Sequence, residues 1–239
     1  MQIYVVRPGD NVDRIAAESQ IPVETIVFDN QIEYPYRLAV GQALFLRSGQ
    51  QPGERTPLYV SGYAYPFINS QVLEETLQWL TAIYIFSYGF TLEGSLIPPE
   101  IDDGPVIEAA ARMRVRSVLT LTPFGSDGRF NNNLVTVLVG SLEVQRNLIL
   151  ELGRVMQQKG YGGLDIDFEY VRSEDREEFA RFVERTTQVM NLLGYPVSVA
   201  LAPKTSREQT GLLYEGIDYR LLGAAANRAM LMTYEWGYT

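Results

Sequence analysis

After Leu58, short apolar runs alternate with longer stretches in which apolar residues recur every three or four positions. The short runs predict strands and the longer stretches predict helices. The expected strands are residues 58–65, 82–88, 117–122, 163–169, 197–202 and 229–234. The expected helices are residues 71–80, 105–115, 142–159, 173–193 and 219–226. This repetition favours a parallel α/β sheet, either closed as a barrel or doubly wound. No glycine-rich phosphate loop follows the first strand, which makes a nucleotide-binding fold the weaker alternative.

The first 46 residues carry a different pattern, which predicts strand, helix, helix and strand in that order. Residues 3–6 form an apolar start, residues 7–10 a turn, and Asp10 or Asn11 is positioned to cap a helix. A second helix is expected over residues 23–28, ending at Asn30, before a strand within 38–46. Residues 48–57 are rich in Gly, Gln, Pro and charge and have no periodicity, which is typical of a linker. The expected organisation is therefore a small βααβ module over 1–47, a linker over 48–57 and an α/β domain over 58–239.

One predicted strand carries an unusual set of side chains. In residues 164–169, strict alternation places Asp165, Asp167 and Glu169 on one face and three large apolar residues on the other. Burying three carboxylates costs several kcal/mol unless they are paired or neutralised, and neighbouring carboxylates push each other's pKa values apart. One of them can thereby become a proton donor near neutral pH. The alternative is a solvated strand face or an ion-pair network.

The run Gly163-Leu164-Asp165-Ile166-Asp167-Phe168-Glu169 resembles the fourth-strand signature of family 18 glycoside hydrolases, written DGxDxDxE. The three matching acids are Asp165, Asp167 and Glu169. The first Asp of the signature falls on Gly162, so a relay of charge through that carboxylate is not expected here. The resemblance implies a (β/α)8 TIM-type barrel, of which about six βα units are present in this chain.

Composition narrows the possible chemistry. The chain has no Cys and no His, which excludes disulfides, thiolate zinc sites, cysteine nucleophiles and the Ser-His-Asp triad. Carboxylates, Tyr and Lys remain for acid–base work. A net charge of −9 argues against a nucleic-acid partner. No apolar run approaches a membrane span, and Met1 leads almost directly into a predicted strand. We therefore expect synthesis in the cytoplasm without a signal peptide, and no membrane partner.

The N-terminal module resembles a LysM domain in its residues Tyr4-x-Val6-x-x-Gly9-Asp10, Ile15-Ala16, Asn30 and Gly41-Gln42-x-Leu44. That family binds N-acetylglucosamine-containing glycans of peptidoglycan or chitin in a groove between two loops. The resemblance places the glycan contacts at Gly9, Asp10, Asn11, Val12, Asn30, Gln31 and Ile32. The alternative for each polar position is a turn or capping role, which Gly, Asp and Asn often have.

In a barrel, chemistry lies at the carboxyl ends of the strands. That rule selects a set of side chains that can stack on sugar faces or contact a substrate: Tyr63, Tyr65, Phe86, Tyr88, Tyr234, Glu235 and Trp236. The alternative for each aromatic residue is packing within the barrel.

The sixth strand carries a second match. Residues 232–235 resemble the MxYD-like motif of the same glycosidase family, with Tyr234 in the substrate-contacting position and Glu235 replacing Asp. The run from Thr233 to Gly237, together with the LysM-like module, is most similar to the spore cortex-lytic branch. Members of that branch are N-acetylglucosaminidases that act on peptidoglycan fragments containing muramic lactam. The resemblance implies a location in the cell wall, spore cortex or spore coat.

The mechanism implied by the resemblance is substrate-assisted hydrolysis with retention of configuration. Glu169 is the acid and base, with a pKa raised by burial and by Asp167. Asp167 orients the acetamido nitrogen, Tyr234 binds the acetamido oxygen, and Asp165 supports Asp167. No metal or organic cofactor is implied. Two alternatives remain, a noncatalytic carbohydrate-binding protein on the same barrel and an unrelated scaffold whose acidic strand binds a divalent cation.

The number of strands leads to one further expectation. Six barrel strands are predicted, and an eight-stranded barrel needs two more. We therefore expect the sequence to be a fragment, a truncated product or part of a complementing assembly.

Overall fold

The structure is a computed structural model that describes residues 2–47, 58–125 and 128–234. The chain divides into two compact units, Met1–Leu58 and Tyr59–Thr239, and each is described by itself. The predicted linker over 48–57 lies outside the described residues.

The first unit has the predicted βααβ order. Its elements are β1 (Gln2–Val5), α1 (Val12–Ser19), α2 (Val23–Asp29) and β2 (Ala43–Leu46). The two strands pair antiparallel, with Gln2 opposite Leu46. One face of this ribbon and one face of each helix enclose a small core, formed by Val6, Val12, Ile15, Ala16, Ile21, Ile26, Leu44 and Leu46.

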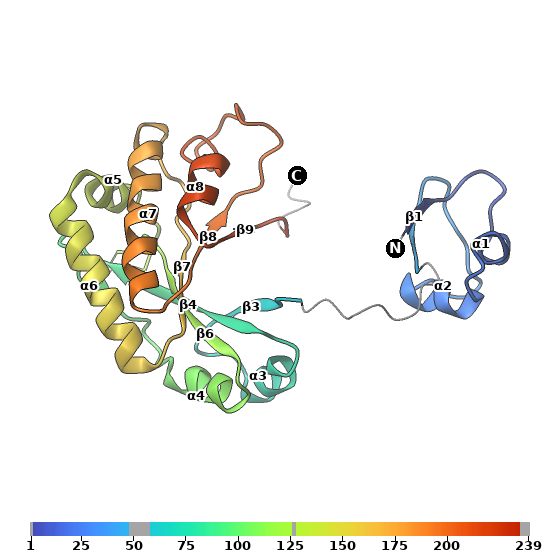
Figure 1. Cartoon of the computed structure of the whole chain (residues 1–239), viewed down its shortest axis with the longest axis horizontal. Helices are drawn as coiled ribbons and strands as arrows, with labels where there is room; N and C mark the ends of the chain where they lie inside the picture. Colours follow the sequence, from blue (N-terminus) through green and yellow to red (C-terminus); the bar gives the residue numbers. More distant parts are fainter. Residues whose placement is uncertain (1, 48–57, 126–127, 235–239) are drawn as a thin grey trace. The chain divides into compact units, whose positions relative to one another are not determined.

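The second unit is a parallel sheet covered by helices (Figure 1). Its strands are β3 (Ser61–Ala64), β4 (Ala82–Phe90), β6 (Arg116–Leu121), β7 (Gly163–Ile166), β8 (Val197–Leu201) and β9 (Arg228–Leu231), hydrogen-bonded in that order. The short β5 (Leu96–Ile97) pairs antiparallel with the end of β4. The helices are α3 (Ser70–Leu77), α4 (Gly104–Arg112), α5 (Asn132–Gly140), α6 (Leu142–Lys159), α7 (Arg176–Leu192) and α8 (Tyr219–Ala225).

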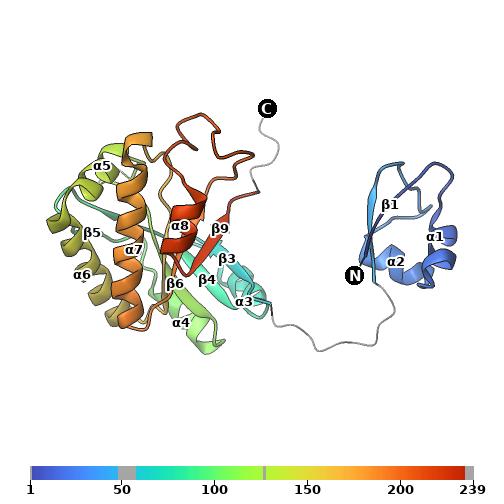
Figure 2. The same ribbon diagram turned by 45° about the horizontal axis from the view of Figure 1, so that its top comes forward.

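This sheet curls into part of a TIM-type barrel, and Figure 2 shows its helices on the convex side. Leu164 and Ile166 of β7 belong to the large core under the helices. Inside the curl, Ala82, Tyr84 and Val118 form a second cluster. Tyr63 of β3 and Met230 of β9 both pack against that cluster, so the first and last strands of the sheet share one interior core.

Local signals explain the best-predicted helix. Helix α6 begins where the Ser141 side chain accepts a hydrogen bond from the Val144 amide. It ends at Gly160, which adopts the left-handed conformation with φ of 82°. These bounds coincide with the expected range 142–159.

Some elements differ from the expectation. The sequence analysis did not predict α5 or the short β5, and several strands end early, β7 at Ile166 and β9 at Leu231. In the part of the chain that the structure describes, no helix is long and apolar enough to cross a membrane.

Candidate active site

A cavity of about 420 Å³ opens at the carboxyl ends of the strands of the curled sheet. It brings together most of the residues predicted for the site, and it is lined by Tyr63, Ala64, Tyr65, Phe86, Phe130, Asp167, Glu169 and Tyr234. These residues come from segments up to 171 positions apart in the sequence, so only the curled sheet unites them.

Asp165 lies beneath this cavity and is 0% exposed. Its carboxylate accepts hydrogen bonds from the Tyr63 hydroxyl at 2.8 Å and the Ser198 hydroxyl at 2.6 Å. Burial raises the pKa of Asp165 to about 6, while these two hydrogen bonds oppose the rise because they favour the charged form. Ser198 was not predicted, and its place opposite Asp165 in the β7–β8 pairing is what brings it there.

Asp167 is 6% exposed and lines the cavity. Its Oδ1 atom has no hydrogen-bond partner among the described residues. Burial, followed by the charges of Asp165 and Glu169, raises the pKa of Asp167 to about 8. At neutral pH the proton therefore rests on Asp167, whereas Asp165, with its two hydroxyl donors, carries the charge.

Glu169 is half-buried at the wall of the same cavity. Its charge contributes to the raised pKa of Asp167, and both residues line the same cavity. The three acids therefore rise from the interior of the sheet to its mouth in the order Asp165, Asp167 and Glu169. The raised pKa expected for Glu169 itself remains a prediction.

Aromatic side chains form much of the cavity rim. Tyr65 stacks on Phe67 at a centroid distance of 4.9 Å and meets Phe86 edge-on at 5.3 Å. Phe86 contacts Phe124 at 5.9 Å, and Phe124 contacts Phe130 at 4.6 Å. The sequence analysis missed Phe67 and Phe130 because both lie in loops beyond the predicted strand ends.

A neighbouring cavity of about 580 Å³ shares Tyr65 and Phe86 with the first. Its other described lining residues include Ile97, Pro98 and Phe124. Neither cavity is lined by Lys or Arg in the described part of the chain, and the acids at the two walls are Glu100, Asp167 and Glu169. The pair of cavities therefore suits an elongated, uncharged ligand with flat apolar faces.

The prediction that Tyr88 lines the site is wrong. Tyr88 is 1% exposed and belongs to the core under the helices, where its hydroxyl donates to Asp103 at 2.8 Å. The β4–β6 register shifts between Ile85 and Tyr88, which interrupts the alternation of side chains along β4. Phe86 therefore faces the cavity, whereas Tyr88 turns to the opposite face.

Of the three site residues predicted after the sixth strand, the structure describes Tyr234. Tyr234 lines the cavity and is 69% exposed. Glu235 and Trp236 lie outside the described residues.

The structure explains why a glycine, Gly162, occupies the position of the first Asp in the signature. A Cβ atom on this residue would lie 2.9 Å from Cγ of Arg116. The space that a side chain would need is taken by Arg116, which also lies at the amino end of the sheet with Tyr59 and Arg228.

In the first loop of the N-terminal unit, the predicted glycan-binding side chains have structural roles. Val12 is 2% exposed and belongs to the small core, which leaves its backbone as the part that could contact a glycan. The Asn11 side chain caps α1 by accepting from the Arg14 amide at 2.8 Å. Asp10 accepts from the Tyr4 hydroxyl at 2.7 Å and from a backbone amide at 2.8 Å. Gly9 provides the turn, with φ of +86°.

In the second loop, the Asn30 side chain also has a structural role. Its side chain donates to the carbonyls of Ile26 at 2.8 Å and Phe45 at 2.9 Å, and accepts from the Phe45 amide at 2.6 Å. Ile32 packs against the small core. Gln31 is exposed and has a positive φ of 51°. A contact with glycan at any of the named loop positions remains a prediction: Gly9, Asp10, Asn11, Val12, Asn30, Gln31 and Ile32.

The divalent-cation alternative has no support in the geometry. Within residues 2–47, 58–125 and 128–234, no group of three or more Asp or Glu side chains is arranged to hold a metal ion.

Comparison with known proteins identifies the first unit. Residues 4–47 match the model of the LysM domain. Relatives of the chain are named as a lytic enzyme and a glycosylase. The chain is 28% identical to the cortical fragment-lytic enzyme of Bacillus subtilis (strain 168), over 100% of this chain and 67% of that protein.

Solved structures of similar fold include enzymes of the same kind. The spore cortex-lytic enzyme SleL of Bacillus cereus is 26% identical, with a TM-score of 0.73 over 99% of this chain and 54% of that one. The chitinase of Chromobacterium violaceum, at 18% identity and a TM-score of 0.69 over 76% of this chain and 57% of that one, shows the fold alone. The chain thus spans between about half and two thirds of the length of these proteins. The predicted resemblance to a LysM domain joined to a cortex-lytic glycosidase, and the partial TIM-type barrel, are confirmed.

Proposed function

We propose that this protein is a glycoside hydrolase that cleaves N-acetylglucosamine-containing glycans of the bacterial cell wall or spore cortex, with retention of configuration. The observation that carries the proposal is the row of three carboxyl groups, Asp165, Asp167 and Glu169, which we call the acidic ladder. Asp165 and Asp167 are buried, Asp167 holds a proton at neutral pH, and Asp167 and Glu169 line a cavity with aromatic walls. The names of the relatives, a cortical fragment-lytic enzyme and a spore cortex-lytic enzyme, support this substrate class.

In the proposed reaction, the proton held by Asp167 passes to Glu169 at the cavity wall, and Glu169 protonates the glycosidic oxygen as the leaving group departs. The acetamido oxygen of the substrate attacks the anomeric carbon and forms an oxazolinium intermediate. Water, deprotonated by Glu169, then opens this intermediate at the anomeric carbon and restores the original configuration.

The neighbouring groups have supporting roles in this scheme. The Oδ1 atom of Asp167, without a partner among the described residues, offers an acceptor to the acetamido N–H. Asp165 stabilises the proton shared within the ladder, and the hydroxyls of Tyr63 and Ser198 stabilise its charge. Tyr234, at the cavity rim, donates to the acetamido oxygen.

The LysM domain would hold the enzyme on the same polymer, which raises the local concentration of glycan at the cavity. This role places the protein at the cell wall or spore cortex when it acts.

The test is release of reducing sugar from purified spore cortex, vegetative peptidoglycan and chitin by the wild type and by Glu169→Gln. We expect the variant to bind glycan in a pull-down and to lose turnover by a factor of about 10²–10⁴. Equal turnover by both proteins would overturn the role of Glu169. Binding without turnover by the wild type on all three polymers would favour a noncatalytic glycan-binding protein.

A further inference from the structure

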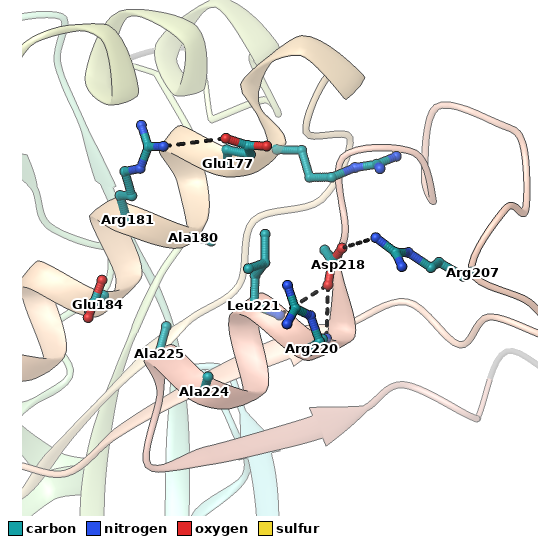
Figure 3. Close-up of a pocket in the computed structure, with 11 residues that line it drawn as sticks. Glu177, Ala180, Arg181, Glu184, Arg207, Asp218, Arg220, Leu221, Ala224 and Ala225 are labelled. Atoms are coloured by element: carbon teal, nitrogen blue, oxygen red, sulfur yellow. Dashed lines mark hydrogen bonds and ion pairs between the residues drawn. The ribbon is translucent and has the colours of Figure 1, made fainter.

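Two adjoining cavities lie between α7, α8 and the loop after β8, and Figure 3 shows the residues that line the larger of the two. They share no residue with the acidic cavity, which is the cavity lined by Asp167 and Glu169. Their volumes are about 480 and 380 Å³. The residues common to both are Arg176, Arg207, Asp218 and Arg220.

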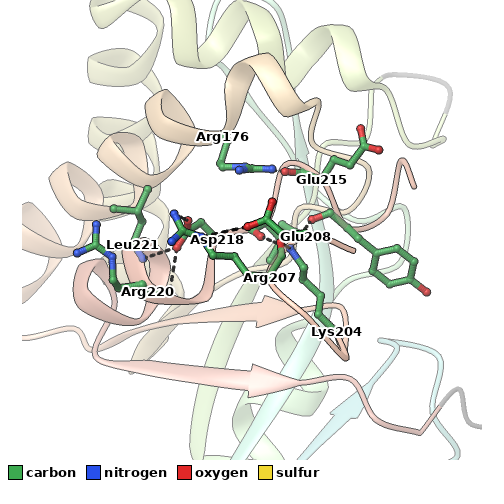
Figure 4. Close-up of polar contacts among 10 residues, drawn as sticks. Arg176, Lys204, Arg207, Glu208, Glu215, Asp218, Arg220 and Leu221 are labelled. Carbon is green, nitrogen blue, oxygen red and sulfur yellow. Dashed lines mark hydrogen bonds and ion pairs between the residues drawn. The ribbon is translucent and has the colours of Figure 1, made fainter. Parts of the chain in front are cut away.

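The cations come from separate segments and are poorly paired (Figure 4). Arg176, the first residue of α7, donates through Nε to the Glu215 carbonyl at 2.6 Å. Arg207, in the loop, comes only within 3.9 Å of carboxylate oxygens of Asp218 and Glu208. Among the described residues, the Arg220 side chain makes no hydrogen bond or ion pair. Three guanidinium groups that line the two cavities therefore retain unused donors.

Three of the nearby acids are committed to other groups, while Glu184, which also lines the larger cavity, accepts from the Gln188 side chain at 3.5 Å. Asp218 Oδ1 accepts from the first amides of α8 at 2.9 and 3.0 Å. The Glu215 carboxylate accepts from the Gly211 amide at 2.9 Å. Glu177 pairs with Arg181 at 3.3 Å. None of these carboxylates offers a close, dedicated partner to the three guanidinium groups.

Lys204 adds a fourth positive charge at the smaller cavity. Its ammonium group donates to the carbonyls of Arg207, Tyr214 and Ile217 at 2.9–3.2 Å, and so is held by neutral oxygens. Desolvation, followed by the charge of Arg176, lowers the pKa of Lys204. The positive charge here is therefore incompletely neutralised, although the chain carries a net charge of −9.

Two arginines elsewhere on the molecule are paired with a carboxylate. Arg14 pairs with Glu18 at 2.9 Å, and Arg154 pairs with Glu151 at 3.2 Å. The cavities between α7 and α8 thus combine positive charge, unused planar donors and open space, which is the chemistry of an anion site.

We propose that these cavities bind an oxyanion, a phosphate or carboxylate group, through Arg176, Arg207 and Arg220. In a cell wall, such a group belongs either to a phosphodiester polymer or to the peptide carboxylates of the glycan. The site is separate from the acidic cavity, and the proposal does not depend on glycan hydrolysis.

The experiment is calorimetric titration of the full chain with inorganic phosphate at low ionic strength. We expect a Kd on the order of 1 mM for the wild type, and binding at least about tenfold weaker for the double variant Arg207→Gln/Arg220→Gln. Arg154→Gln, which removes a paired and remote arginine, is the matched control and should bind as the wild type does. Both substituted arginines are exposed, and thermal unfolding checks that each variant is folded.

Two outcomes would overturn the proposal at this stage. The first is no heat of binding up to about 20 mM phosphate. The second is equal weakening in the double variant and the control, which would indicate diffuse electrostatic attraction.

Competition against phosphate identifies the source of the oxyanion. A glycerol phosphate oligomer that displaces phosphate from the wild type, but binds weakly to the double variant, would establish the phosphodiester source. A di-acidic peptide with the same behaviour would establish the peptide source. If neither ligand competes, the site binds an adventitious ion only and the proposal fails. Glycan turnover by the double variant should equal that of the wild type, which separates this test from that of the proposed function.

Discussion

The LysM domain and the curled-sheet unit differ in how their candidate polar side chains are used. Asn30 in the LysM domain makes three hydrogen bonds to backbone, and Asn11 caps a helix. Asp167 in the second unit is more deeply buried than either of them, yet its Oδ1 atom has no partner among the described residues. A buried polar atom without a hydrogen-bond partner lowers the stability of the folded protein. Its presence therefore indicates that Asp167 has a role other than stabilising the fold. Substitutions should therefore affect activity in one unit and stability in the other.

The largest expected effect is on turnover at Asp167. Asp167→Asn keeps the size of the side chain. It removes the charge and the ability to exchange a proton with the neighbouring carboxyl groups of Asp165 and Glu169. We expect turnover on spore cortex to fall by about 10²-fold or more, with the protein still folded. Initial rates, with circular dichroism as the folding check, measure this. Turnover within a factor of about 2 of the wild type would remove Asp167 from the mechanism.

At high pH, Asp167→Asn should be more stable than the wild type. The pKa of Asp167 is raised to about 8, so the folded state binds this proton more tightly than the unfolded chain. The resulting stability is fully present below about pH 4 and is lost as the pH rises through 8. We expect Asp167→Asn to exceed the wild type by up to about 5 kcal/mol in free energy of unfolding at pH 8.5, with little difference at pH 4. Urea unfolding at both pH values is the measurement, and a pH-independent difference would contradict the burial argument.

In the LysM domain, Asn30→Ala should act mainly on stability. The substitution leaves the backbone groups of Phe45 and Ile26 without their side-chain partner. We expect a loss of about 1–3 kcal/mol in the unfolding of this domain. Gln31→Ala is the matched control, since Gln31 is exposed, and should change stability by less than about 0.5 kcal/mol. If Asn30→Ala weakens glycan binding while unfolding is unchanged, the contrast between the two units fails.

The smallest expected effect is on the pH dependence of activity. Tyr63→Phe removes one of the two hydroxyl donors to Asp165, which lowers the stability of its charged form. The pKa of Asp165 should therefore rise above its value of about 6, and the acidic limb of the pH–rate profile should move up by about one unit. Ser198→Ala, which removes the other donor, should move the limb in the same direction. If the variant profiles coincide with that of the wild type, the ionisation of Asp165 does not determine the acidic limb.

Sequence patterns predicted the parts of this molecule in which local and long-range preferences agree. The bounds of α6 followed from Ser141 and Gly160, and the alternation of acids in β7 predicted that Asp165 and Asp167 share a face. The position of Tyr88 could not be predicted in this way, because it depends on a register shift between β4 and β6. Ser198 was missed for the same reason, since only pairing of β8 with β7 places it opposite Asp165.

The shared interior core of β3 and β9 has a consequence for synthesis. Met230 and Tyr63 pack against one cluster, and the guanidinium of Arg228 lies 3.9 Å from the ring centroid of Tyr59. These contacts join segments about 170 residues apart, which is a high contact order and a slow step in folding. The cavity needs Tyr63 from one end of the sheet and Tyr234 from the other. A nascent chain on the ribosome therefore has no complete site until β9 has emerged and docked, however early the acidic strand has formed.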